Sequence, residues 1–526
     1  MSLTFTLAPG NAASRRRRTS SGAIIQGSSP RPATRDGVLP LWGTGSRCAT
    51  TTPSIRLPSG AGGTDVLRGK SGWLLALGIA AGAAAVWGMA RRGPRAAPDI
   101  VLIVIDSLRA DELDRTVGGR PVMPHLSRWA EGALRFTEAR APSCSTPTSV
   151  AAMLTSLPIP ATHVTFKRGL PEGVTTIAQV LREAGYRTAA YSANPNVTAR
   201  LGFDRGFDTM VEAYVDPELS ERVRIQPRHP GWIVRPEVLF DLAWKDLHDG
   251  DDRPRFSYIH ILQPHAPYEP PPPHRDLFRV PGAPEVDASI PSIAAHDDRP
   301  LDPRWLAALR ARYDEHAHYA DAAVGSFLDR LGSDPRFSRA AVVVLSDHGE
   351  GFGEHRRLFH NTTVYEEMLR IPMLWRLPGD GRRRGRSDAR VDLLDVAPTL
   401  CAIAGVEPPR QFWGRNLLAA EPTAHRTFLA VARPPALRYP PFIALLDFPT
   451  KLIRNERTGE QRLFDLSRDP WERHDLSGEE PERLAEAVRR LESELARCRA
   501  LGLAPGKAAP PPKEQLQRLR SLGYAD

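Results

Sequence analysis

The sequence predicts an α/β protein with a mainly parallel central sheet flanked by helices, plus a small C-terminal antiparallel subdomain with a helix. Apolar runs at 101–105 and 341–345 end abruptly in polar residues, which is typical of buried central strands. Strand-like and helix-like segments alternate between them, as expected for parallel strands joined by helical crossovers. Beyond about residue 425, four short strand-like runs precede a final amphipathic stretch.

The length of 526 residues exceeds what one small core can organise, and 41% hydrophobic residues are typical of a globular protein. We expect a catalytic domain and a smaller subdomain behind an N-terminal extension. The predicted parts are a disordered basic segment at 1–72, a transmembrane anchor at 73–90, a catalytic domain at 98–425, a C-terminal subdomain at 426–500, and a linker with a terminal helix at 501–526.

The net charge of +9 belongs to the N-terminal extension. Residues 1–95 hold thirteen Lys and Arg against two acidic residues, so the remainder of the chain is slightly acidic. A nucleic-acid partner is therefore not expected. The four cysteines are widely spaced and form no CxxC pair, which argues against a zinc ribbon or a disulfide scaffold.

Residues 73–90 are uncharged, rich in Ala and Gly, and just long enough to cross a bilayer. Trp73 and Trp87 would lie near the two interfaces, and Arg91 and Arg92 close the segment. A buried helix or an uncleaved signal sequence is the alternative. We expect a membrane-anchored protein with an extracytoplasmic catalytic domain, although basic residues on both flanks leave the orientation open.

The remaining elements follow from apolar periodicity and from Gly and Pro punctuation. We expect helices at 124–132, 150–157, 176–184 and 305–331, and strands at 134–137, 186–192, 256–262 and 371–375. In the C-terminal part we expect strands at 427–431, 442–446, 451–455 and 461–465, and helices at 481–499 and 515–522. No pattern is readable at 211–255 or in the proline-rich stretch 267–273, where we expect substrate specificity to lie.

Asp106, Asp347 and His348 are the candidate ligands of a metal ion. Each follows an apolar strand directly, and the carboxyl ends of parallel strands meet at one edge of a sheet. Carboxylates and an imidazole at one place suit a divalent cation. A lone Asp at a strand end is otherwise often only a helix cap.

Ser145 and two histidines are the candidate catalytic residues. Ser145 precedes a predicted helix, where backbone N–H groups favour an anion and a nucleophilic hydroxyl, although an ordinary serine cap fits the same pattern. His265 lies just beyond a strand and could protonate a leaving group, and His360 follows Asp347 closely. Taken singly, each histidine is more often a core or surface residue.

Several motifs, in order, resemble the sulfatase family of the alkaline-phosphatase superfamily. They cover roughly residues 98–478: Val104-Ile-Asp-Ser-Leu-Arg-Ala-Asp111, Gln263-Pro-His-Ala-Pro-Tyr268, Ser346-Asp-His-Gly-Glu-Gly-Phe-Gly-Glu-His355, Tyr365-Glu-Glu-Met-Leu-Arg-Ile-Pro372, Asp392-Leu-Leu-Asp-Val-Ala-Pro-Thr399 and Leu463-Phe-Asp-Leu-Ser-Arg-Asp-Pro-Trp-Glu472.

The resemblance implies an alkaline-phosphatase-like fold with a four-stranded C-terminal subdomain. It also implies a set of metal ligands, namely Asp106, Ser145, Asp347 and His348. The cation would be Ca²⁺ by resemblance, whereas the ligand chemistry alone also suits Mn²⁺ or Zn²⁺. His265 and His360 would contact the substrate anion or the leaving group.

Three departures from the family pattern concern charge. Family members carry Cys or Ser, converted to formylglycine, with an Arg four residues later; here Ser145 is followed by Ser149 at that place. Many sulfatases have a Lys-x-His element where this chain has Ala193-Asn-Pro195, and a second Asp where it has Ser107. These departures put formylglycine formation and sulfate binding in doubt.

The sequence therefore predicts a metal-dependent hydrolase of sulfate esters. One alternative is a phosphodiesterase or phosphoryl-group transferase that uses Ser145 directly. The other is a catalytically weak member that binds an anion or a glycan. The partner would be a sulfated or phosphorylated small molecule, glycan or lipid.

Overall fold

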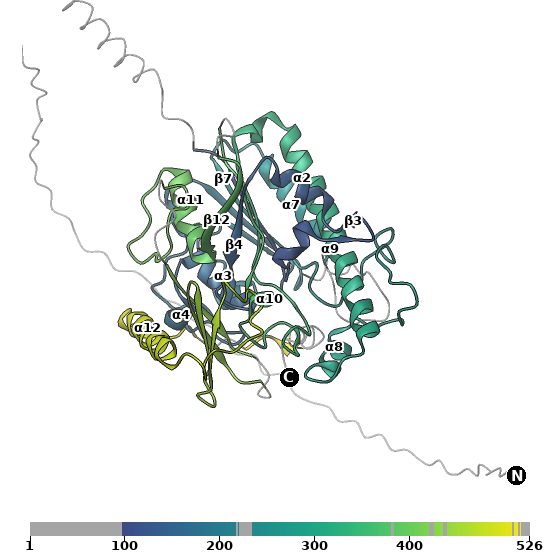
Figure 1. Cartoon of the computed structure of the whole chain (residues 1–526). Helices are drawn as coiled ribbons and strands as arrows, with labels where there is room; N and C mark the ends of the chain where they lie inside the picture. The colour runs from purple at the N-terminus through teal and green to yellow at the C-terminus, as the bar shows by residue number, and fades with distance from the viewer. Residues whose placement is uncertain are drawn as a thin grey trace, which may run out of the picture. The chain divides into compact units, whose positions relative to one another are not determined.

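The computed structural model (Figure 1) describes one compact unit within residues 91–526. The described residues are 97–216, 219, 234–379, 383–419, 426–434, 439–507, 510–513 and 516. No helix among them is long and apolar enough to cross a bilayer. The predicted anchor at 73–90 and most of the predicted helix at 515–522 lie outside the described residues.

An eight-stranded sheet forms the centre of this unit, in the order β12-β4-β11-β8-β1-β7-β5-β6. All neighbouring pairs are parallel except those made by β11, which runs antiparallel to β4 and β8. The strands are β1 (Ile100–Ile105), β4 (Leu134–Arg140), β5 (Arg187–Ser192), β6 (Thr209–Glu212), β7 (Arg255–Ile261), β8 (Ala341–Ser346), β11 (Met373–Arg376) and β12 (Gly385–Asp392). The predicted mainly parallel sheet is confirmed.

Helices cover both faces of the sheet, because alternate residues of each buried strand point to opposite sides. Ile100, Leu102 and Val104 share a core with α3 (Thr146–Thr155), α5 (Ile177–Glu183) and α11 (Val396–Ala404). Val101, Ile103 and Ile105 share the other core with α2 (Pro124–Ala130), α7 (Pro236–Leu247) and α9 (Pro303–Ser333). Figure 1 shows α11 and α9 on opposite sides of the strands.

Short elements complete the main unit, and most of them flank loops. They are η1 (Ala110–Asp114), β2 (Thr116–Val117), β3 (Arg120–Pro121), α4 (Ile159–Thr162), η2 (Ala199–Leu201), α8 (Ile290–His296), η3 (Pro335–Arg339), β9 (Gly351–Phe352), β10 (Leu358–Phe359), α10 (Glu366–Leu369) and η4 (Leu393–Asp395).

A four-stranded antiparallel sheet follows, as predicted, with the order β13-β14-β15-β16. Its elements are β13 (Thr427–Ala432), β14 (Phe442–Asp447), β15 (Thr450–Asn455), β16 (Gln461–Asp465) and α12 (Pro481–Ala500). One face packs on α12, and the other packs around α10 through Met368 and Leu369.

Ion pairs made by Lys451 connect the C-terminal sheet to the central sheet. This buried side chain of β15 lies 2.9 Å from Glu366 Oε1 and 2.7 Å from Glu472 Oε1. Arg140 of β4 contacts the other oxygen of Glu366 at 2.8 Å. The C-terminal sheet is thereby tied to the central sheet near the segment that follows β8.

Several elements were not expected from the sequence, among them α11, α8, β6, β12 and α7. The edge strand β12 is polar along half its length and lacks an apolar pattern, because only part of it is buried. Helix α7 lies within 211–255, where no pattern was read, and it begins with a proline that resembles loop punctuation. Helix α3 starts at Thr146 rather than near 150, since proline is well tolerated in a first helical turn.

Candidate metal and ester-binding site

Parallel register places two carboxylates side by side. Ile105 of β1 is paired with Ser346 of β8, so the next residues, Asp106 and Asp347, emerge at the same level. Both are completely buried. Ser107 adopts a left-handed conformation with φ 59° and holds both groups. Its hydroxyl donates to Asp106 Oδ1 at 2.8 Å, and its N–H donates to Asp347 Oδ1 at 3.2 Å.

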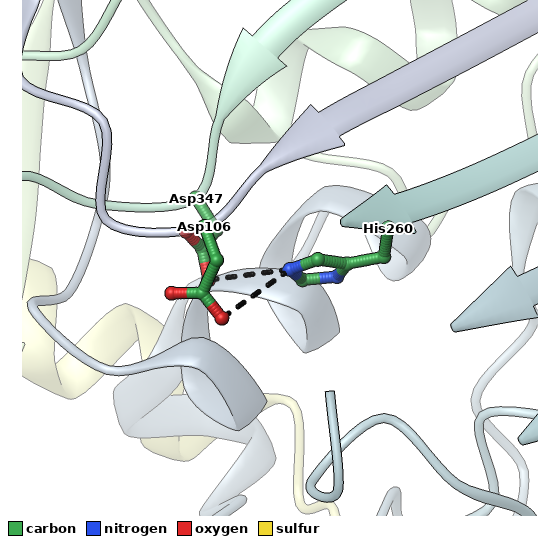
Figure 2. A group of neighbouring side chains, drawn as sticks. All are labelled: Asp106, His260 and Asp347. Carbon is green, nitrogen blue, oxygen red and sulfur yellow. Dashed lines mark ion pairs between the residues drawn. The ribbon is translucent and has the colours of Figure 1, made fainter. Parts of the chain in front are cut away.

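His260 of β7 faces this carboxylate pair from the adjacent strand. Figure 2 shows its ring directed at both acids, with Nε2 lying 3.7 Å from Asp106 Oδ2 and 3.9 Å from Asp347 Oδ2. Ligand atoms of these three buried residues lie within 4.8 Å of one another, as a shared ion requires. Sequence reasoning missed His260, although a histidine inside a buried apolar strand is unusual.

His348 approaches the same carboxylates from a second direction. Its Nε2 lies 3.7 Å from Asp106 Oδ1 and 3.6 Å from Asp347 Oδ2. Its Nδ1 is 2.9 Å from the carbonyl of Gly349, which fits a proton on Nδ1 and a lone pair on Nε2. The predicted ligands Asp106, Asp347 and His348 are thus brought together.

The N-terminus of α3 carries two hydroxyls, and that of Thr146 contacts the site. Ser145 is the N-cap residue, and its buried hydroxyl has no hydrogen-bond partner among the described residues. The hydroxyl of Thr146, a residue that the sequence did not single out, lies 3.3 Å from His348 Nε2. Ser149, in the place of the expected Arg, is buried and donates to the carbonyl of Ser143, so it brings no charge.

Asn194 occupies the place of the family's cationic element and bonds to the site as a neutral amide. Its Oδ1 accepts from the N–H of Asn196 at 2.7 Å, which fixes the orientation of the amide group. Its Nδ2 therefore points inward and donates to Asp106 Oδ2 at 2.5 Å and to Thr146 Oγ1 at 3.3 Å.

His265 and His360, the residues predicted to contact the substrate, lie beside the metal candidates, with their rings in edge-to-face contact. Their ring centroids are 4.8 Å apart, and those of His360 and His348 are 4.5 Å apart. The Nδ1 of His360 lies 3.1 Å from Glu350 Oε1, which orients its unpartnered Nε2. Glu350 lies in the motif that runs from Ser346 to His355, but its role in orienting His360 was not expected from the sequence.

Burial controls the protonation of the site. It raises the pKa of Asp347, and the neighbouring charge of Asp106 adds to this shift. Burial also lowers the pKa of His265 and, far more, that of His360, which stays neutral at pH 7. For Asp106, burial is outweighed by the nearby imidazoles, with His265 first, so its pKa falls well below the usual range.

The residues present fit a divalent cation. Several atoms here are buried without hydrogen bonds among the described residues, including Asp347 Oδ2, His260 Nε2 and the Ser145 hydroxyl. Burying such groups unpaired costs about 1–3 kcal/mol each. One ion coordinated by carboxylate and imidazole atoms would satisfy them together.

Comparison with known proteins gives a consistent result. Residues 98–406 match the family model described as Sulfatase. The chain is 25% identical over 411 residues to an ulvan-active sulfatase of Formosa agariphila, covering 72% of this chain and 77% of the relative. It is also 25% identical over 458 residues to human arylsulfatase K, covering 75% of this chain and 82% of the relative.

Solved structures share the fold. The phosphonate monoester hydrolase of Agrobacterium radiobacter superposes with a TM-score of 0.61 at 19% identity, covering 77% of this chain and 96% of that one. A protein bound to its substrate D-glucosamine-2-N,6-O-disulfate gives a TM-score of 0.61 at 17% identity, covering 77% of this chain and 98% of that one.

Proposed function

The chain belongs to the sulfatase family, and we propose that it hydrolyses sulfate esters with Ser145 as nucleophile and one divalent cation. The prediction of a sulfatase-type hydrolase is confirmed at the level of the family and the fold. The observation that carries the proposal is the convergence of buried, unsatisfied ligand atoms with a helix N-terminus.

Asp106, Asp347 and His348 would hold the cation, with the Ser145 hydroxyl as a further ligand. The cation would supply positive charge next to the ester oxygens and the attacking oxygen. The first backbone N–H groups of α3, next to Ser145, would interact with the negatively charged ester, because a helix N-terminus attracts anions. His360, held by Glu350, would present Nε2 to a substrate oxygen.

The leaving-group oxygen would need a proton. His265 is a suitable donor after substrate binding, since its Nδ1 is fixed 2.6 Å from the carbonyl of Ala266. The lowered pKa of His265 reflects burial, and an arriving anion would oppose that effect.

A sulfated glycan is the substrate class we propose. One relative is named as a sulfatase active on ulvan, and a solved structure holds its substrate D-glucosamine-2-N,6-O-disulfate. The first of these supports the proposal by sequence, while the second supports only the shared fold.

A second candidate is hydrolysis or transfer of a singly charged phosphorus ester. Ser149 and Asn194 remove two positive charges that the family pattern places beside the anion. An unmodified Ser145 hydroxyl attacks phosphorus more readily than sulfur, and a phosphonate monoester hydrolase shares the fold. A member that only binds anions or glycans is the third candidate.

One assay series separates these candidates. Purified full-length protein, the Ser145→Ala variant and the Thr146→Val variant are tested on an aryl sulfate, a phosphodiester and a phosphonate monoester. We expect sulfate turnover that disappears in Ser145→Ala. If sulfate turnover is lost in Thr146→Val but kept in Ser145→Ala, Thr146 is the nucleophile. If only the phosphorus esters are hydrolysed, the second candidate function is correct. Mass spectrometry of the Ser145 peptide distinguishes serine from formylglycine.

We also propose that the catalytic domain at 98–425 and the subdomain at 426–500 are held at a membrane by residues 73–90, on the extracytoplasmic side. The support is the uncharged segment flanked by tryptophan and arginine.

A further inference from the structure

We infer that His260 is a metal ligand that stands in for the missing second aspartate, so the site prefers Zn²⁺ over Ca²⁺. This inference rests on the proposed function only in that the same cation would serve the reaction. Its evidence is the geometry of β7 next to the two carboxylates (Figure 2).

Ser107 cannot replace the aspartate whose place it takes. Its hydroxyl is bonded to Asp106 Oδ1, and its N–H is bonded to Asp347 Oδ1. Ser107 therefore positions the two carboxylates and adds no third carboxylate. The position of the missing ligand is open to a side chain from the neighbouring strand.

The spacing around His260 Nε2 is that of ligands around an ion. At 3.7 and 3.9 Å from the two carboxylates, this nitrogen is too distant for a good hydrogen bond. Two ligand atoms each about 2.1 Å from a tetrahedral ion lie roughly 3.4 Å apart. A modest contraction of the site would therefore bring all three groups into coordination.

Tyr258 fixes the histidine in the required state. Its hydroxyl lies 2.8 Å from His260 Nδ1, and both side chains are buried on the same face of β7. When Nδ1–H donates to this hydroxyl, Nε2 presents its lone pair to the carboxylates. Metal-bound histidines commonly use such a partner on the other ring nitrogen, so we assign Tyr258 as a positioning residue.

The donor set is poor in oxygen. His260 and His348 would add two imidazoles to the two carboxylates and the Ser145 hydroxyl, and Asn194 offers no oxygen because its Oδ1 accepts the N–H of Asn196. Calcium takes six to eight oxygen ligands, whereas zinc accepts four nitrogen and oxygen ligands. Imidazole suits zinc, whereas calcium and manganese favour carboxylate, carbonyl and water oxygens.

The test measures metal binding without substrate. Full-length protein is stripped with a chelator and titrated calorimetrically with Zn²⁺, Mn²⁺ or Ca²⁺ alone. We expect Zn²⁺ to bind at least about tenfold tighter than Ca²⁺. Tyr258→Phe should lose about 10- to 100-fold in Zn²⁺ affinity. His260→Gln should lose more, because it removes the ligand itself, and its Ca²⁺ affinity should change less.

Matched controls are Tyr186→Phe and His318→Gln, whose side chains contact backbone carbonyls away from the two carboxylates. Both should bind Zn²⁺ like the parent protein. Equal Zn²⁺ affinity in His260→Gln, or tightest binding of Ca²⁺ by the parent, would overturn the inference.

Cobalt substitution provides a readout that survives partial loss of affinity. The visible absorption of the Co²⁺-loaded protein should change in Tyr258→Phe, because the imidazole it orients is bound to the ion. An unchanged spectrum would contradict the inference even where His260→Gln fails to fold. Ester turnover is measured separately. Selective Zn²⁺ binding without sulfate turnover would contradict only the proposed function. Sulfate turnover without selective Zn²⁺ binding would contradict only the role of His260.

Discussion

Replacing Lys451 by methionine should strongly destabilise the protein, because this ammonium group is shared by two buried carboxylates. The side chain is 1% exposed and lies within 2.9 Å of both Glu366 and Glu472. Glu366 would keep its contact with Arg140, but Glu472 would lose its cation. Removing one partner of such a buried ion pair costs about 3–5 kcal/mol.

Urea unfolding followed by circular dichroism measures this loss at pH 8. Burial raises the pKa of Glu472 to about 7 even though Lys451 opposes that shift, so without Lys451 this pKa would rise further. The added substitution Glu472→Gln should restore part of the stability, because it removes a buried carboxyl group that has lost its cation. Lys245→Met on the exposed surface of α7 is the control and should change little. A loss below about 1 kcal/mol in Lys451→Met, or no rescue by Glu472→Gln, would refute the reasoning.

Two further predictions concern pH and location. Burial lowers the pKa of His316 from 6.5 to about 3, so this imidazole is neutral in the folded state while the unfolded chain takes up a proton below pH 6.5. Stability should therefore fall as pH drops through that window, by about 2 kcal/mol at pH 5 from this group alone, and His316→Gln should flatten urea midpoints measured between pH 7.5 and 5. If the urea midpoint of His316→Gln falls with pH as steeply as that of the parent protein, His316 is not the group responsible. For location, full-length protein should resist alkaline extraction from membranes, whereas a chain starting at residue 97 should be released; release of both would remove the proposed anchor.

The sequence predicted the sheet well because its buried strands are short, apolar and sharply bounded. The positions of Asp106 and Asp347 followed from the same pattern, since a polar residue directly after such a strand is easily recognised. The C-terminal strands were placed within a few residues, because alternation and turn residues agree there. The partly exposed edge strand β12 has no such pattern and was missed.

The remainder of the site depends on register, which sequence spacing does not contain. His260 becomes a ligand candidate only because β7 pairs with β1 so that it lies opposite Val104, two residues before Asp106. Asn194 was noted as a departure, yet its two inward hydrogen bonds depend on the loop after β5. Thr146 was not considered from the sequence, although its hydroxyl lies 3.3 Å from His348 Nε2.

The carboxylates and His260 come from β8, β1 and β7, which are consecutive in the sheet but widely separated along the chain. No short fragment of the polypeptide contains the site, and a chain with β1 unpaired from either neighbour cannot form it. A bound cation would therefore stabilise only molecules whose central strands have all assembled, through mass action on the folded state. Metal retention would then serve as a sensitive reporter of complete folding during expression and refolding.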